Sequence, residues 1–172
     1  MEFLLADSER EDFETLWSID QQCFAVGIAY TQRELAAYMR QWGSFTLVVR
    51  PATAAENDAR ESRYEAVPGS GIMGFLVAVA GRRGVGHIIT IDVLPQARRL
   101  GLGSKLLHAA EERLRLANCR SVYLETAVDN HAALAFYKRH QYFLVKTVPR
   151  YYANQVDALV LQKDLLSAAQ AS

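Results

Sequence analysis

The amino-acid sequence predicts a mixed α/β fold built on one sheet. Strand-like runs rich in β-branched and aromatic residues alternate with segments in which apolar residues recur at helical spacing. A nearly continuous apolar run at residues 87–93 is followed by a helix-like segment and then by another strand-like run at 121–128. Because two strands joined by a crossover helix form a parallel pair, this order predicts one parallel pair within the sheet.

The first half of the chain is predicted to form an antiparallel meander flanked by two helices. The second of these helices is expected to begin at Thr31, because Thr31 and Glu34 match a capping box. Residues 51–69 are mostly polar or small, so we expect a flexible insertion there. The three strands of the meander are expected at residues 3–6, 45–49 and 72–79.

The second half is predicted to continue from the central strand through alternating helices and strands. Its first helix carries a stripe of leucine and alanine residues between Leu102 and Ala117, which indicates one buried face. The expected helices are 104–117 and 130–140, and the expected strands are 121–128, 143–148 and 158–162.

Composition limits the classes of protein to which this chain can belong. With 172 residues, 51% hydrophobic and 22% charged, it is expected to form one globular domain over residues 1–172. Its 19 basic and 19 acidic residues balance, which argues against nucleic acid or a membrane surface as partner. No apolar run is long enough to cross a bilayer, and the N-terminal segment is acidic, so we expect a cytoplasmic protein.

The two cysteines, Cys23 and Cys119, lack the spacing of a zinc site or of a disulfide framework. We therefore expect no metal site. Both side chains are expected to act as small buried hydrophobes.

The junction between the strand at 87–93 and the following helix is predicted to bind phosphate. Gly101 and Gly103 allow a tight turn that brings backbone N–H groups close to an anion, and the helix adds its unpaired first-turn donors. The spacing matches neither a dinucleotide fingerprint nor a P-loop. A purely steric need for two glycines at such a turn is the alternative. The residues of this junction are Arg98, Arg99, Leu100, Gly101, Leu102, Gly103 and Ser104.

A second motif strengthens the assignment of residues 98–104 as a phosphate loop. Asn130, Ala133, Phe136 and Tyr137 match an Asn-x-x-Ala-x-x-Phe-Tyr signature. Together the two motifs resemble the GNAT superfamily of N-acetyltransferases, and the resemblance extends over most of the chain. It departs from the family at Gln141, where a glycine is usual, so a left-handed helix end is expected to be filled by a residue that tolerates it less well.

The resemblance implies a fold and a cofactor. The fold would have three layers, with a central mixed sheet of about seven strands, helices on both faces and a splayed parallel strand pair. Acetyl-CoA would be the acetyl donor, with its diphosphate on the junction loop and its pantetheine arm along the strand edge at Ile91 and Val93. The backbone N–H of Val93 or Leu94 would polarise the thioester carbonyl. Asn130 and Tyr137 complete the cofactor site that the resemblance implies.

Three residues are candidates for the chemistry of acyl transfer. Tyr137 matches the family's general acid, a phenol that can protonate the departing thiolate; the alternative is a core tyrosine with a satisfied hydroxyl. Glu125 matches the base of bacterial ribosomal-protein-alanine N-acetyltransferases, against the alternative of a solvated residue on the sheet. His87 stands where related N-terminal acetyltransferases carry a catalytic tyrosine, or it is an exposed residue at the start of a strand. The sequence leaves open whether Glu125 or His87 is the base.

The acceptor is expected to be an amine. Tyr151 and Tyr152 resemble the peptide-binding hairpin of protein N-terminal acetyltransferases, or they cap the sheet edge; with Tyr30 they are the expected acceptor-binding residues. The leading hypothesis is direct acetyl transfer to a protein N-terminal α-amino group, of the ribosomal-protein-alanine type. The alternatives are acetylation of a small amine or polyamine and a CoA-binding regulatory module without turnover. We expect a monomer or a homodimer.

Overall fold

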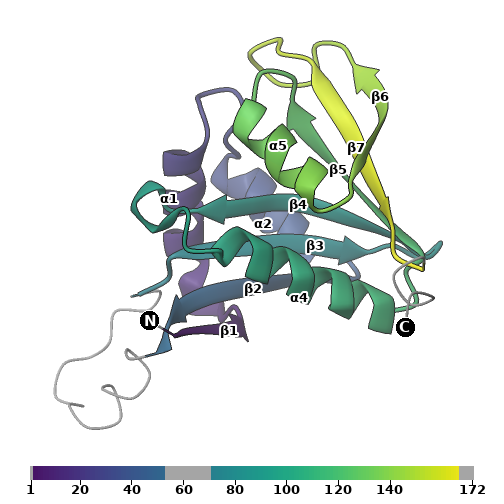
Figure 1. Cartoon of the computed structure of the whole chain (residues 1–172). Coiled ribbons are helices and arrows are strands. Elements are labelled where there is room, and N and C mark those ends of the chain that lie inside the picture. Colours follow the sequence, from purple (N-terminus) through teal and green to yellow (C-terminus); the bar gives the residue numbers. More distant parts are fainter. Residues whose placement is uncertain (1, 53–70, 167–172) are drawn as a thin grey trace, which may run out of the picture.

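The computed structural model describes residues 2–52 and 71–166, and it confirms the mixed α/β fold (Figure 1). One sheet contains seven strands in the order β1-β2-β3-β4-β5-β7-β6. The pair β4–β5 is parallel and every other neighbouring pair is antiparallel. The strands are β1 (Phe3–Asp7), β2 (Ser44–Pro51), β3 (Gly74–Ala80), β4 (Val85–Val93), β5 (Ser121–Ala127), β6 (Phe143–Val148) and β7 (Ala158–Asp164).

Helices cover both faces of the sheet. The α-helices are α1 (Phe13–Cys23), α2 (Gln32–Arg40), α4 (Leu102–Leu116) and α5 (His131–Arg139), and the short 3-10 helices are η1 (Arg10–Asp12) and η2 (Pro95–Ala97). Figure 1 shows α4 and α5 on the near side of the sheet and α2 behind it. Strand alternation builds the two cores: Leu76 of β3 packs on the α4 side, whereas Phe75 and Val77 pack on the side of α1 and α2.

The parallel pair separates along its length. Backbone pairing between β4 and β5 runs only from Val85 opposite Ser121 to His87 opposite Tyr123. Beyond that point β4 continues to Val93 and β5 to Ala127 as separate strands, and Figure 1 shows β5, β7 and β6 fanning away from β4. A register shift opposite Val77 and Ala78 of β3 inserts Ile89 into β4 as a bulge, which bends the strand at the point of divergence.

Local sequence signals fix several element ends as predicted. Thr31 caps α2 by accepting the N–H of Glu34, whose carboxylate in turn accepts the N–H of Thr31 at 2.8 Å. Gln141 has φ +69°, so the left-handed position after α5 is occupied by a non-glycine residue. α4 begins at Leu102, two residues earlier than expected. The predicted insertion at 51–69 lies outside the described residues, except for Pro51, which ends β2, and Ala52.

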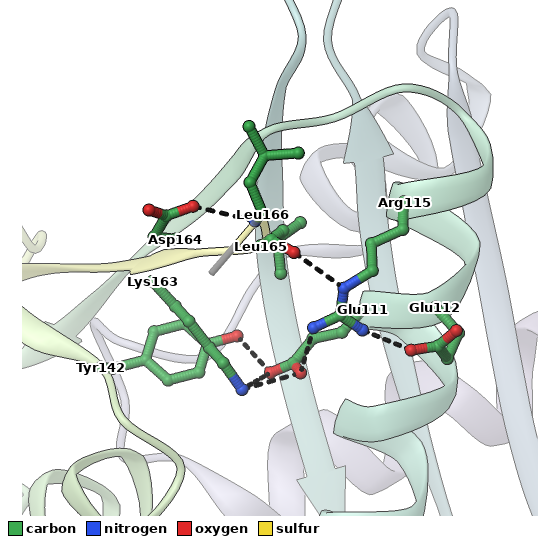
Figure 2. Close-up of polar contacts among 8 residues, drawn as sticks. All are labelled: Glu111, Glu112, Arg115, Tyr142, Lys163, Asp164, Leu165 and Leu166. Atoms are coloured by element: carbon green, nitrogen blue, oxygen red, sulfur yellow. Dashed lines mark hydrogen bonds and ion pairs between the residues drawn. The ribbon is translucent and has the colours of Figure 1, made fainter. Parts of the chain in front are cut away.

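One buried charge on α4 has no counterpart in the sequence-based prediction. Glu111 lies within the apolar stripe and is buried. Its carboxylate accepts hydrogen bonds from Lys163 of β7 and from the Tyr142 hydroxyl, as Figure 2 shows. The Arg115 guanidinium on the same helix lies 3.9 Å away and donates to the Leu165 carbonyl at 3.0 Å. These contacts connect α4 to β7 and to the turn that follows α5.

Two further observations bear on the expected class of protein. Among residues 2–52 and 71–166, no helix is long and apolar enough to span a membrane, and no cluster of three or more His, Cys, Asp or Glu side chains could hold a metal ion. Cys23 and Cys119 are free thiols; Cys119 is buried and Cys23 is partly exposed.

Candidate functional site

A groove of about 970 Å³ lies where β4 and β5 diverge. Its walls come from the segment between α1 and α2, from β4, from the start of α4, from β5, from α5 and from the loop between β6 and β7. The strand divergence exposes backbone edges that would otherwise pair, and the helix ends close the groove. Such a long groove between open strand edges suits a linear ligand rich in amides.

The predicted phosphate loop forms one end of this groove. Arg98, Arg99, Gly101, Leu102, Gly103 and Ser104 line the groove, whereas Leu100 is 49% exposed and does not. Gly101 adopts φ +77° at the N-cap of α4, and no side chain caps the helix, so its first-turn amides are available to an anion. A Cβ on Gly103 would lie 3.4 Å from the Phe136 ring, an ordinary contact distance, so α5 packs directly against this first turn of α4.

Ser104 has a partner that the sequence did not indicate. Its hydroxyl lies 2.9 Å from His140 Nε2 at the end of α5. Burial and the neighbouring His108 lower the pKa of His140, which favours the neutral ring. The contact joins the start of α4 to the end of α5 on one side of the groove.

The open edge of β4 lies along the groove through Ile91 and Val93. The N–H of Leu94 donates to the Met73 carbonyl at 2.9 Å and is therefore already used on the β3 side. Successive N–H groups of a strand point to opposite edges, so the N–H of Val93 points to the open edge. Of the two backbone N–H groups predicted to polarise the thioester carbonyl, that of Val93 is therefore available and that of Leu94 is not.

The two candidate bases contact each other. His87 Nε2 lies 2.7 Å from Glu125 Oε2, and both side chains are partly buried. The His87 ring stacks on Tyr123, with centroids 4.2 Å apart and planes 10° apart. His87 belongs to the last paired position of the β4–β5 ladder, and Glu125 lies two residues further along β5, where it lines the groove. The pair therefore stands at the point of strand divergence.

Tyr137 is buried on α5 and lines the groove. Burial raises the pKa of its phenol, so the hydroxyl stays protonated. Its ring packs edge-on against Tyr142, with centroids 5.5 Å apart. The helix that positions it is capped by Asn130, whose side-chain oxygen accepts the N–H of Ala133 at 3.2 Å. Asn130 also lines the groove.

The three tyrosines expected to bind the acceptor lie in different environments. Tyr30 and Tyr152 line the groove, whereas Tyr151 is 45% exposed and packs edge-on against Tyr152 at 4.9 Å. Burial, together with the negative charge of Glu125, raises the pKa of Tyr151 to about 12, so its hydroxyl stays protonated at neutral pH. Tyr30 is fixed through its side chain, because its hydroxyl donates to the Ile89 carbonyl at 3.3 Å.

Sequence reasoning missed three polar residues around the groove. Cys23 lines it, and its thiol lies 3.4 Å from the Val93 carbonyl; burial raises the pKa of this thiol to about 11. Asp20 and Asp92 lie buried between α1 and β4. A carboxylate inside the apolar run of the central strand was a signal for Asp92, since charged residues are rarely buried without a partner.

Fold and groove together define an acyltransferase architecture of the kind that takes a CoA thioester, and comparison with known proteins identifies the family. The sequence model of the acetyltransferase (GNAT) family matches residues 6–142, so the chain belongs to this family. The resemblance drawn from the phosphate loop and the α5 motif is confirmed. Members of this class transfer the acetyl group of acetyl-CoA.

Individual relatives give more detail. An N-alpha-acetyltransferase of Sulfurisphaera tokodaii is 40% identical over 81 residues, which cover 46% of this chain and 48% of the relative. The chain thus spans about half the length of the curated relatives that it matches. The structure of Ard1 from Thermoplasma volcanium superposes with a TM-score of 0.76 at 25% identity, covering 95% of this chain and 98% of that one.

A third comparison shows the fold alone. The ribosomal-protein-S18-alanine N-acetyltransferase of Escherichia coli superposes with a TM-score of 0.75 at 17% identity, over 95% of this chain and 94% of that one.

Proposed function

We propose that this protein transfers the acetyl group of acetyl-CoA directly to the α-amino group at the N-terminus of a polypeptide. One observation carries the proposal: the uncapped N-terminus of α4 and the Glu125–His87 pair lie at the same groove. The first suits a phosphorylated donor and the second suits an amine that must lose a proton. The N-alpha-acetyltransferase relatives support the choice of acceptor.

The chain's own residues fit the donor. The backbone amides from Gly101 to Ser104 would hold the diphosphate, with Arg98 and Arg99 supplying positive charge at the rim. The edge of β4 at Ile91 and Val93 would accept the amide-rich arm as an added strand. Acetyl-CoA supplies an activated acetyl group as a thioester, and no metal is needed for that chemistry.

The residues at the strand divergence would carry the proton transfers. The amine nitrogen forms a bond to the carbonyl carbon, and its proton passes to Glu125 or His87, directly or through a water molecule. The Val93 N–H would stabilise the carbonyl oxygen as negative charge develops. The carbon–sulfur bond then breaks, and the departing thiolate takes the proton of the Tyr137 hydroxyl. The products are the acetylated amine and free CoA.

The acceptor would enter past three tyrosines. Tyr30 and Tyr152 in the groove wall, with Tyr151 at its rim, offer aromatic faces and hydroxyls to a peptide backbone. A peptide that begins with alanine is our first choice of acceptor. The structural likeness to the ribosomal-protein-S18-alanine enzyme motivates this choice.

A panel assay of CoA release tests the proposal. Short peptides that begin with different residues are compared with small amines and polyamines at fixed acetyl-CoA concentration, for the wild type and for Glu125→Gln. We expect turnover with peptides, led by an alanine N-terminus, and a turnover at least about 100-fold lower in Glu125→Gln. Glu112→Gln is the matched control, because Glu112 is exposed on α4 and outside the groove.

Other results would assign a different function. Turnover with polyamines but not with peptides identifies a small-amine acetyltransferase. Tight binding of CoA without acetyl transfer to either panel identifies a regulatory module. No heat of binding with CoA in calorimetry contradicts the donor site itself.

A further inference from the structure

Asp20 of α1 and Asp92 of β4 form a pair of carboxyl groups in the core beside the groove. Asp20 is 0% exposed and Asp92 is 1% exposed. The end of α1 lies against the end of β4, where the Cys23 thiol is 3.4 Å from the Val93 carbonyl, and burial and the charge of Asp20 both raise the pKa of Asp92. Among the ion pairs of the described residues, neither carboxyl has a lysine, arginine or histidine partner. Two negative charges this close together in the core would be strongly unfavourable.

Two carboxyl oxygens without donors indicate a proton between the two groups. Asp20 Oδ1 and Asp92 Oδ2 are buried, and neither has a donor among the described residues. A carboxylate has no proton to donate, so two carboxylates cannot satisfy each other. One proton held between them supplies the missing donor and removes one of the two charges at the same time.

The remaining contacts indicate which group carries that proton. Asp20 Oδ2 accepts the backbone N–H of Tyr30 at 2.7 Å and the Gln21 side chain at 3.2 Å, and both bonds stabilise a negative charge. Asp92 Oδ1 accepts only the Thr90 hydroxyl, at 2.5 Å. Burial raises the pKa of both groups, that of Asp92 well above its ordinary value. The proton therefore belongs on Asp92, and Asp20 is the ionised partner.

The other ionisable groups around the pair do not neutralise the two carboxyl groups. Beyond burial, the charge of Glu34 on α2 raises the pKa of Asp20, while burial raises the pKa values of Cys23 on α1 and Tyr137 on α5, so both stay protonated. Among the described residues, the Arg98 guanidinium lowers the pKa of Asp92, and its Nε donates to the Val93 carbonyl at 3.2 Å. Its effect ranks below burial and below the charge of Asp20.

The pair connects two walls of the groove. Asp20 holds the backbone of Tyr30, the residue whose carbonyl also accepts Trp17 Nε1 at 3.0 Å and Gln21 Nε2 at 2.7 Å. Asp92 immediately precedes Val93, the residue with the open amide at the edge of β4. A bond between the two carboxyls therefore sets the distance between the tyrosine wall and the strand edge.

We propose that Asp20 and Asp92 share a single proton and that this hydrogen-bonded pair is a positioning device, which fixes Tyr30 against the edge of β4. The two residues do not line the groove themselves, and they reach it through neighbours that do, among them Tyr30, Thr90 and Val93. They act on binding through those neighbours rather than on the reacting atoms.

The shared proton is tested on the free protein. Carbon-13 NMR of the aspartate carboxyl groups, recorded against pH, should show one carboxyl that stays protonated at neutral pH in the wild type. In Asp92→Asn that signal is lost and no other protonated carboxyl replaces it. Asp164→Asn, a change to an exposed carboxylate that accepts the Leu166 N–H at 2.8 Å, should leave the signal unchanged. A wild type in which every aspartate is ionised at neutral pH overturns the proposal, and this result needs no variant to fold.

The positioning role is tested by hydrogen exchange at the Tyr30 amide. The asparagine amide in Asp92→Asn can still donate to Asp20, so protection should be retained. Asp20→Ala removes the acceptor, and exchange should become about tenfold faster. Equal protection in Asp20→Ala and the wild type would contradict the role assigned to Asp20.

One further measurement rests on the proposed function. Asp20→Ala should raise KM for the peptide about tenfold while KM for acetyl-CoA changes less than about twofold. An inactive wild type would refute the proposed function and leave the carboxyl titration and the exchange result standing. Equal effects on the two KM values in an active enzyme would refute the positioning role alone.

Discussion

Two buried carboxyl sites in different parts of the fold are balanced in opposite ways. Glu111 receives two hydrogen bonds from Lys163, at 3.1 and 2.9 Å, and one from the Tyr142 hydroxyl at 3.0 Å (Figure 2). Asp20 and Asp92 have only each other and neutral donors. The first site is compensated by a cation, whereas the second is compensated by a proton.

The difference separates a structural contact from one that depends on pH. The Glu111 site is an ion pair with Lys163, and its hydrogen bonds do not depend on a proton shared between two acids. A proton shared between two carboxyls is lost when pH rises far enough, and the repulsion that follows acts directly beside the groove. The fold thus uses a permanent charge where α4 meets β7 and a titratable bond where α1 meets β4.

The largest effect is expected when Glu111 loses its ion-pair partner Lys163. Lys163→Met leaves Glu111 buried with only the more distant Arg115 as positive neighbour, and should lower the free energy of unfolding by about 3–5 kcal/mol. Chemical denaturation measures this change. Lys146→Met on the exposed face of β6 is the matched control, with an expected change below about 0.5 kcal/mol. A loss of under about 1 kcal/mol in Lys163→Met would place this pair with ordinary surface ion pairs.

The next largest effect is expected on catalysis, at Tyr137, which packs against Tyr142 and lines the groove. Tyr137→Phe removes the hydroxyl assigned to protonate the thiolate, and should lower kcat about 100-fold, equivalent to about 2.7 kcal/mol. The ring packing against Phe136 and Tyr142 is kept, so affinity for CoA should change little in calorimetry. An unchanged kcat would return Tyr137 to a purely structural role in the core.

Short-range features of both regions could be predicted from the sequence. The capping box at Thr31, the cap at Asn130 and the left-handed Gln141 depend on residues within a few positions of each other. The parallel pair followed from the order of strand, helix and strand, which chain connectivity restricts strongly. The start of α4 was placed two residues late, because Gly101 allows the helix to begin directly after its left-handed turn.

Long-range polar pairs could not be predicted in the same way. Glu111 and Lys163 are 52 positions apart, and His87 and Glu125 are 38 apart, so only the packed sheet brings each pair together. His87 and Glu125 were both candidates for the base, and their contact depends on the register in which His87 pairs with Tyr123. Asp20 and Asp92 are 72 positions apart, and neither was singled out from the sequence.

The site formed by Asp20 and Asp92 should give the protein a characteristic dependence of stability on pH. The folded state holds a proton on Asp92 above the ordinary aspartate pKa, and the unfolded state does not. The free energy of unfolding should therefore fall as pH rises, by up to about 1.4 kcal/mol per pH unit, from near pH 4 until pH passes the raised pKa. Asp92→Asn has no such proton and should lack this component. Parallel curves for Asp92→Asn and the wild type between pH 5 and about 8 would exclude the shared proton.

The smallest effect, and the sharpest contrast with Tyr137, is expected at Tyr142. Tyr142→Phe removes one neutral donor from Glu111 while Lys163 keeps both of its bonds, so the free energy of unfolding should fall by only about 1–2 kcal/mol. Its hydroxyl points to the charged site on α4 and does not line the groove, so kcat should match the wild type. The ring centroids of Tyr137 and Tyr142 are 5.5 Å apart. Although the two rings are in contact, the same substitution should alter turnover at Tyr137 and stability at Tyr142. A loss of turnover in Tyr142→Phe would show that the Glu111 site and the groove are coupled, and the two regions would have to be treated as one.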